Sequence, residues 1–156
     1  MSKASKKQTT KETKKIMEAK WGKAVIEVYN WTAFPNLLLE RQQALGLDPV
    51  QMNILLVLLK RWWLSSNMPF PGRKEIANTI GRDVSTVTRQ LKKMEDKGLI
   101  ERESQYKNGG QISNKYNLQG LLNKLDAFAK EEKQAQKKIK DDAERKRRGH
   151  VGKAKS

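Results

Sequence analysis

The sequence contains no cysteine and a single histidine, His150. Without thiolates the chain can form neither disulfides nor Cys-rich zinc sites, and one imidazole cannot build a metal site alone. No apolar run approaches the roughly 18 residues that span a bilayer, and the Lys-rich N-terminus lacks the apolar stretch of a secretory signal. We therefore expect a soluble, intracellular and cytoplasmic protein that uses no metal, no cofactor and no membrane.

What the sequence does contain is an excess of positive charge. Lys and Arg number 33 against 17 Asp and Glu, which gives a formal net charge of +16. Such a chain favours polyanionic partners, nucleic acid above all. Its 156 residues suffice for one core-bearing domain with tails. We divide it into a flexible basic N-terminal tail (1–23), a folded domain (24–129) and a charged helical or disordered C-terminal tail (130–156).

The N-terminal part of the sequence shows three different patterns. Residues 1–20 are rich in Lys, Ser and Thr and poor in apolar side chains, so we expect them to be flexible. Residues 24–29 (AVIEVY) contain enough β-branched and aromatic side chains to predict a short strand. Leucines at helical spacing predict a helix over residues 37–45, and Gly46 is a natural stop for it.

A long apolar helix is predicted to begin at Asp48 and Pro49. Asp can cap free helix amides, and Pro is tolerated in the first turn. The apolar side chains that follow cover more than one face, so we expect this helix to be central and surrounded. Trp62 and Trp63 stand at its end. They would suit stacking on single-stranded bases, but aromatic residues in this place favour core packing.

A helix-turn-helix is predicted after a loop over residues 65–72. The spacing of apolar residues predicts a short helix over 73–80, which Gly81 ends. Asp83 is well placed to cap a third helix, 83–97. This order of helix, tight turn and helix is typical of proteins that insert one helix into DNA.

The third helix has a distinct apolar seam. Val87, Leu91 and Met94 recur at positions i, i+4 and i+7 and predict one buried face. The opposite face is then polar and points outward, and Gly98 closes the helix. Exposure of these three apolar side chains would contradict the interpretation.

A β-hairpin and a last helix complete the predicted domain. Residues 99–103 and 115–118 are predicted strands, joined by a turn at residues 108–110. The apolar stripe over 118–128 resumes helical spacing, and it indicates either a dimerisation helix or a cover for the domain's own core. Residues 144–156 are predicted to be disordered.

Together these elements predict a mostly α fold with a small β-hairpin wing, a winged helix-turn-helix with flexible basic N- and C-terminal tails. The residues themselves also carry a resemblance. KEIANTIG at 74–81, DVSTVTRQL at 83–91 and EDKGLI at 95–100 resemble the winged helix-turn-helix DNA-binding family. Arg82 departs from the family's pattern, which often has an apolar residue there. The resemblance implies double-stranded DNA as the ligand.

The predicted DNA-contacting residues follow from how such a fold meets B-DNA. The major groove admits one α-helix, whose polar face meets base edges and phosphates, while the hairpin follows the backbone or minor groove. Arg89 is the predicted specificity residue, although a solvated position or pairing with Glu95 or Asp96 is the alternative. Lys92 and Lys93 fit a solvated helix face equally well. The candidate set is Arg73, Ser85, Thr86, Thr88, Arg89, Lys92, Lys93, Arg102, Lys107 and Lys115.

The predicted function is sequence-specific double-stranded DNA binding by a transcriptional regulator associated with the nucleoid, with helix 83–97 in the major groove and wing 101–118 on the backbone or minor groove. WTAFPNLLL at 31–39, with Trp62 and Trp63, is similar to N-terminal domains of phage and plasmid replication proteins. This resemblance implies the alternative, a replication initiation or partition factor. The expected partners are DNA, a second copy of the chain, and replication or transcription machinery.

An enzyme is not expected. Hydrolysis of nucleic acid needs clustered acids, metal ligands or an activated nucleophile. Asp141 and Asp142 are adjacent, and neighbouring residues do not share a helix face.

Overall fold

The computed structural model describes the backbone of residues 3–153 and the side chains of residues 10–148. Contacts divide the chain into two compact units, one ending at Phe34 and the other beginning at Pro35. Each unit has its own helices, and only the second contains strands among the described residues.

The first unit is helical, contrary to the sequence-based prediction. Helix α1 spans Lys3–Trp21 and α2 spans Lys23–Tyr29, and the two helices contact each other. The segment predicted to be flexible over 1–20 is thus helical from residue 3, and residues 1–2 lie outside the described residues. The strand predicted over 24–29 is part of α2. Ile26 is buried in α2. Packing of the helix thus outweighs the β propensity of the residues around it.

Helix α4, Pro49–Arg61, is central to the second unit, as predicted. It contacts both α5 (Arg73–Ile80) and α6 (Val84–Asp96), and six of its residues are buried. Helix α3 spans only Asn36–Glu40, and the rest of the predicted helix 37–45 forms turns that end at Gly46, with φ 68°.

The tryptophans at the end of α4 differ in their burial. Trp62 packs against the core, as predicted. Trp63 is 71% exposed, so the prediction that it packs in the core is wrong. The physical reason is that α4 ends at Arg61 and Trp62 has left helical geometry, with φ −92° and ψ 84°. Trp63 therefore does not continue the apolar face of the helix.

A polar network around the buried side chain of Gln51 joins α4 to α6. The backbone N–H of Gln51 donates to Asp48 at 2.8 Å, and the Asp48 N–H donates to the Gln51 side chain at 3.2 Å, which forms a capping box. Gln51 has no exposed surface, and its amide also donates to Gln90 at 2.9 Å while accepting from Lys97 at 2.9 Å. Every polar atom of this buried side chain thus has a partner, which fixes the start of α4 against α6.

The helix-turn-helix forms at the predicted residues. Helix α5 ends at Gly81 in the left-handed conformation, with φ 65°, and Asp83 caps α6. Val87, Leu91 and Met94 have no exposed surface. The predicted apolar seam is therefore confirmed, and it fixes which face of α6 points away from the core.

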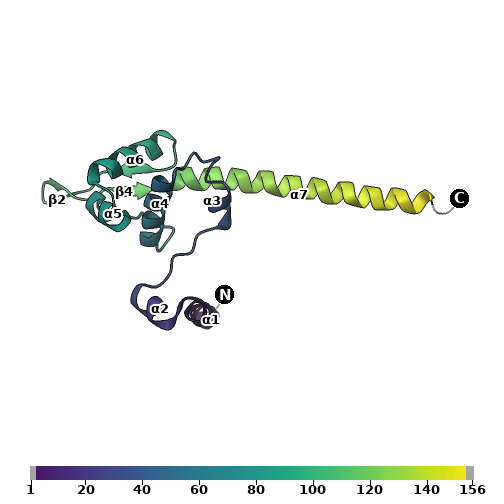
Figure 1. Ribbon diagram of the computed structural model, residues 1–156, viewed down its shortest axis with the longest axis horizontal. Helices are drawn as coiled ribbons and strands as arrows, with labels where there is room; N and C mark the ends of the chain where they lie inside the picture. The colour runs from purple at the N-terminus through teal and green to yellow at the C-terminus, as the bar shows by residue number, and fades with distance from the viewer. Residues whose placement is uncertain (1–2, 154–156) are drawn as a thin grey trace. The chain divides into compact units, whose positions relative to one another are not determined.

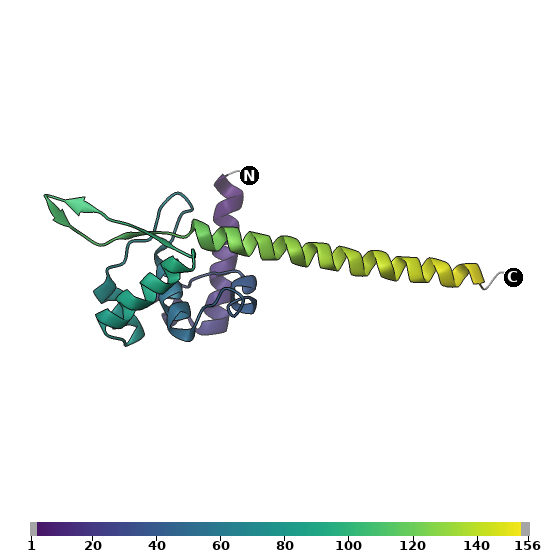
Figure 2. The same ribbon diagram turned by 90° about the horizontal axis from the view of Figure 1, so that it is seen from above.

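The wing is a hairpin in two parts. Strand β1 (Glu101–Glu103) pairs with β4 (Lys115–Asn117), and β2 (Tyr106–Lys107) pairs with β3 (Gly110–Gln111), both antiparallel. Asn108 and Gly109 have φ of 51° and 78°, as a two-residue hairpin turn with the right-handed twist of its strands requires. The hairpin tip protrudes from the helices of this unit (Figure 2).

Helix α7, Gln119–Lys153, begins beside the wing strands and extends away from the hairpin tip (Figure 1). Leu121 and Leu125 are buried in the domain's own core, and Phe128 packs against it. The apolar stripe therefore covers its own domain. The disorder predicted over 144–156 is wrong as far as residue 153, because Lys, Glu, Gln, Ala and Arg are good helix formers. Residues 154–156 lie outside the described residues.

Candidate nucleic-acid interface

The start of α6 is held by the Asp83 carboxylate. The Thr86 N–H and hydroxyl each donate to it at 2.7 Å, and the Ser85 hydroxyl donates to it as well. These hydrogen bonds, with that from Ser85 the strongest, hold the pKa of Asp83 well below its usual range, so the cap stays ionised at neutral pH. The predicted site residues Ser85 and Thr86 therefore have their hydroxyl protons engaged and present only lone pairs outward.

Thr88 and Arg89 follow on the outward side of the same helix. The Thr88 hydroxyl donates to the Val84 carbonyl at 2.8 Å, which leaves its oxygen free to accept. Arg89 is exposed, and its guanidinium makes one long hydrogen bond of 3.4 Å to the Thr86 hydroxyl. The predicted alternative for Arg89, an ion pair with an acidic residue near the end of α6, does not form among the described residues, because both of those carboxylates have other partners.

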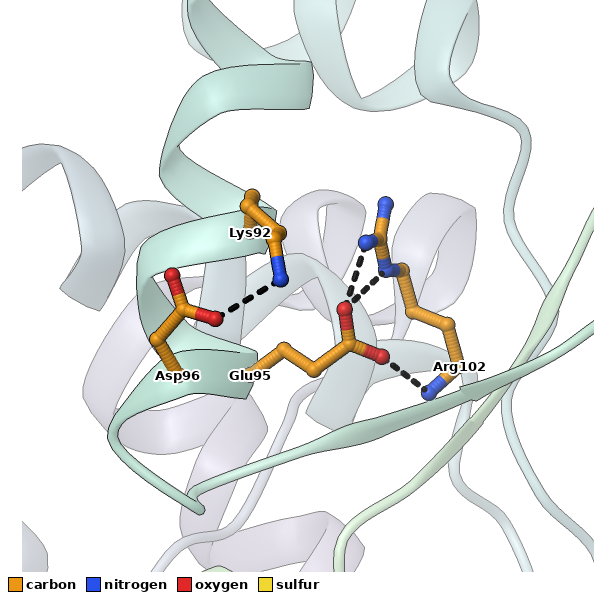
Figure 3. Close-up of polar contacts among 4 residues, drawn as sticks. All are labelled: Lys92, Glu95, Asp96 and Arg102. Atoms are coloured by element: carbon orange, nitrogen blue, oxygen red, sulfur yellow. Dashed lines mark hydrogen bonds and ion pairs between the residues drawn. The ribbon is translucent and has the colours of Figure 1, made fainter.

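Lys92 is one of those partners. Its ammonium lies 2.8 Å from the Asp96 carboxylate, one helical turn further on (Figure 3). The hydrogen bond and charge of Asp96 raise the pKa of Lys92. Both side chains are largely exposed, and such pairs contribute little to stability. Lys92 could therefore exchange Asp96 for a phosphate, whereas Lys93 is exposed and makes no ion pair within residues 10–148.

Arg102 connects the wing to α6. Its Nε donates to a Glu95 carboxylate oxygen at 3.0 Å, Nη2 donates to the same oxygen, and its backbone N–H donates to the other oxygen at 3.2 Å (Figure 3). These bonds, against a smaller opposing effect of burial, lower the pKa of Glu95. Arg102 was predicted to contact DNA, but in this geometry its guanidinium holds the base of the wing against α6.

The other predicted cations lie free on the surface. Arg73 at the start of α5, Lys107 near the wing tip and Lys115 on β4 are all exposed. None of them forms a salt bridge in the part of the chain whose side chains are described. The structure thus leaves Arg73, Arg89, Lys93, Lys107 and Lys115 available to an anionic ligand.

Two residues beside this set, Lys74 and Tyr116, were not among the predicted site residues; for Tyr116 the sequence left contact with sugar or phosphate and packing across the hairpin equally open. Together with Arg73 they line a cavity of about 360 Å³ between the start of α5 and the wing. A signal for Lys74 existed in the sequence, because Gly72 is followed by two basic residues at the beginning of a predicted helix. No local pattern distinguishes Tyr116 from a tyrosine that merely packs across the hairpin.

Two further observations limit the chemistry of the described chain. Within residues 10–148, no three His, Cys, Asp or Glu side chains gather closely enough to hold a metal ion. Among the described helices, none combines the length and apolar character needed to cross a membrane.

The second unit is a mostly helical domain with a small β wing and an outward polar helix. The sequence model of the DnaD N-terminal domain family matches residues 34–137, more than half of the chain. The chain therefore belongs to the DnaD N-terminal domain family. A crystal structure of the N-terminal domain of DnaD protein from Geobacillus kaustophilus HTA426 is similar, with a TM-score of 0.54 and 22% sequence identity. The match covers 74% of this chain and 94% of that one. Comparison with curated proteins found no significant match.

Family membership changes the balance between the two predicted functions. The DnaD N-terminal domain is a replication-related domain, so the finding supports the alternative prediction, a replication role. It does not support the main prediction of a transcriptional regulator, and it shows neither a plasmid nor a phage association. The mostly helical fold with a small wing is confirmed.

Proposed function

We propose that this chain is a replication-associated double-stranded DNA-binding module. The observation that supports the proposal best is the two-sided character of α6. Val87, Leu91 and Met94 have no exposed surface, while Arg89 and Lys93 lie outward without a carboxylate partner among the described residues. A helix anchored on one side and cationic on the other suits the major groove.

In this proposal each group of residues has a different task. Arg89 reaches a base edge, for which a bidentate contact to guanine is the commonest specific interaction. Ser85, Thr86 and Thr88 accept hydrogen bonds or lie against phosphates near the start of α6, and Lys92 and Lys93 meet the backbone. Lys107 and Lys115 follow the backbone or minor groove from the wing. Arg102 acts as a positioning residue, because its pairing with Glu95 sets the wing against α6.

The basic helices add affinity without sequence preference. Each lysine or arginine of α1 or of the outer part of α7 that meets a phosphate releases a counterion, so binding weakens as salt rises. A homodimer remains a further proposal. The stripe over 118–128 does not supply its interface, because Leu121 and Leu125 are buried in their own domain.

Arg89→Ala tests the proposed contact of α6 with base edges. Duplexes selected by the wild-type protein from a random pool are compared with random duplexes by fluorescence anisotropy. Loss of a bidentate base contact weakens binding to the selected duplex by about 1–3 kcal/mol and relaxes specificity. The control Lys93→Ala weakens binding to both duplexes equally. An unchanged preference in Arg89→Ala would sink the assignment.

The replication role has its own test. Sites occupied in the cell are mapped by crosslinking the chain to DNA and sequencing the bound fragments. Occupancy concentrated at repeated sites of a replication origin is expected. Occupancy confined to promoters would contradict a replication role and favour transcriptional regulation.

A further inference from the structure

A cavity lined by both polar and apolar side chains lies between the start of α5, the start of α6 and the wing. Its volume of about 360 Å³ is at the small end of the range for ligand pockets. Arg73 and Lys74 line it from α5, and Ser113 and Asn114 line it from the wing. No carboxylate belongs to its lining. A cavity with two cations and no acid attracts an anion.

The acidic residue nearest in sequence is held elsewhere. Glu75 is the only acid in the first turn of α5. It accepts a hydrogen bond of 3.0 Å from Nε of Arg61, and a second from the same guanidinium. This ion pair joins α4 to α5, so the Glu75 charge is balanced outside the cavity.

Tyr116 provides a donor that the fold does not use. Its side chain lines the cavity and is only 1% exposed, and its hydroxyl donates to no described residue. The hydroxyl is not among the buried polar atoms left without a partner, so it faces the solvent of the cavity. Burial raises the pKa of Tyr116, so the hydroxyl keeps its proton at neutral pH, while the charges of Arg73 and Arg102 oppose that shift. Arg73 lines the same cavity as Tyr116, so both side chains are available to a ligand bound there. Because this hydroxyl reaches the solvent of the cavity, it can exchange water for a ligand oxygen.

The start of α5 faces the same cavity. Gly72 precedes the helix and makes no side-chain cap, so the first amides of α5 have no capping acceptor. The positive end of the helix dipole favours an anion at this place. Two cations and one hydroxyl thus lie at the same cavity as the start of α5.

We propose that this cavity binds one phosphate group, with Tyr116, Arg73 and Lys74 as its side-chain donors. The choice of source rests on the proposed function, under which the phosphate belongs to the DNA backbone. Val84, the first residue of α6, lines the same cavity. A phosphate bound here fixes where α6 enters the groove, because backbone contacts set the register of a protein on duplex DNA.

Tyr116→Phe is the sharpest variant, because it removes the hydroxyl and keeps the buried ring. The full chain is titrated with a short random-sequence duplex over a salt series. Affinity falls about tenfold, the loss of one hydrogen bond to a charged group. The slope of affinity against salt does not change, since no charge is removed, whereas Lys74→Gln lowers that slope by about one. Tyr29→Phe, the same change in α2 outside both the cavity and the wing, keeps wild-type affinity.

A second measurement uses inorganic phosphate alone. In the free protein, phosphate shifts the backbone amide resonances of residues 72–74 and 113–116, and Tyr116→Phe weakens the shift while Tyr29→Phe does not. The duplex selected by wild type, carrying one neutral methylphosphonate linkage at successive positions, then identifies the source. Each contacted linkage weakens wild-type binding when it is neutral, and at the linkage that faces the cavity the loss is smaller in Tyr116→Phe, which has already lost its hydrogen bond there. The same losses in Tyr116→Phe and wild type at every linkage assign the cavity to a free phosphate compound and overturn the backbone source.

Failure of the site and failure of the proposed function give different results. If Tyr116→Phe binds duplex like wild type and phosphate shifts none of these resonances, the phosphate site is overturned while duplex binding stands. If wild type binds no duplex, the proposed function is overturned, and the phosphate shifts alone support or refute the site.

Discussion

Gly120 at the start of α7 lets two backbones meet without an intervening side chain. A Cβ built at this position would lie 2.1 Å from the Gly98 carbonyl oxygen and 3.1 Å from its carbon. Normal contacts are about 3.5 Å, so Gly120→Ala forces α7 back by more than about 1 Å. The N–H of Leu121 donates to the Leu99 carbonyl at 3.0 Å, and that shift breaks the bond.

Two costs and one gain decide the size of the effect. Overpacking costs about 1–3 kcal/mol, and an unpaired buried amide costs about 1–3 kcal/mol. Replacing Gly by Ala in a helix recovers at most about 1 kcal/mol. We therefore expect Gly120→Ala to lower the free energy of unfolding by about 1–5 kcal/mol.

Urea denaturation followed by circular dichroism measures this change as a lower midpoint at an unchanged slope. Gly72→Ala is the matched control, because nothing lies within 4 Å of its added Cβ. Its stability stays within about 1 kcal/mol of wild type, since alanine is less favourable than glycine at this N-cap position. Equal stability of the two variants would refute the close approach of α7 to the α6–β1 turn.

Two other perturbations test the wing contact and the basic helix. Arg102 holds the pKa of Glu95 below its ordinary 4.5, so the stabilisation is present above that pH and is lost as pH falls through the folded-state pKa. When the pH is lowered from 4.5, the free energy of unfolding of Glu95→Gln therefore falls less than that of wild type. Urea denaturation at a series of acidic pH values measures this fall, and an equal fall in both proteins would contradict the pairing. Replacing Lys14 and Lys15 of α1 with Gln should weaken binding to selected and random duplexes alike and reduce the salt slope, by about one for each lost phosphate contact. An effect on the selected duplex alone would disagree with a sequence-independent role.

The helix-turn-helix could be predicted from the sequence because its determinants are local. Asp83 caps the helix that follows it, Gly81 ends the helix before it, and the apolar seam repeats within three turns. Such signals depend on residues a few positions apart, so they survive without knowledge of the fold.

The helical ends of the chain could not be predicted from composition. A Lys-rich segment with few apolar residues resembles a disordered tail, yet the same residue types favour helices. Ion pairs one turn apart, such as Lys14–Glu18 at 3.6 Å, add to this preference. In α2, contacts with α1 decided between helix and strand, and no pattern within six residues contains that information.

The sequence could predict which residues belong to the candidate interface, but not which of them form ion pairs. Arg89 and Arg102 look alike in sequence, as arginines near a polar surface. Only the return of β1 alongside α6 brings Glu95 to one of them and leaves the other free. The sequence could not decide between DNA contact and hairpin packing for Tyr116, because the cavity that it lines exists only once the wing lies against α5.

The direct backbone contact at Gly120 has a mechanical consequence. A contact between side chains can absorb a displacement through rotamer changes. A carbonyl group in direct contact with the backbone of a helix cannot adjust in this way. Residues 130–153 of α7 extend about 36 Å at the usual helical rise. A force that a binding partner applies to this part of α7 therefore acts at the start of the helix. It is transmitted through the backbone contact to the turn that orients α6 and the wing.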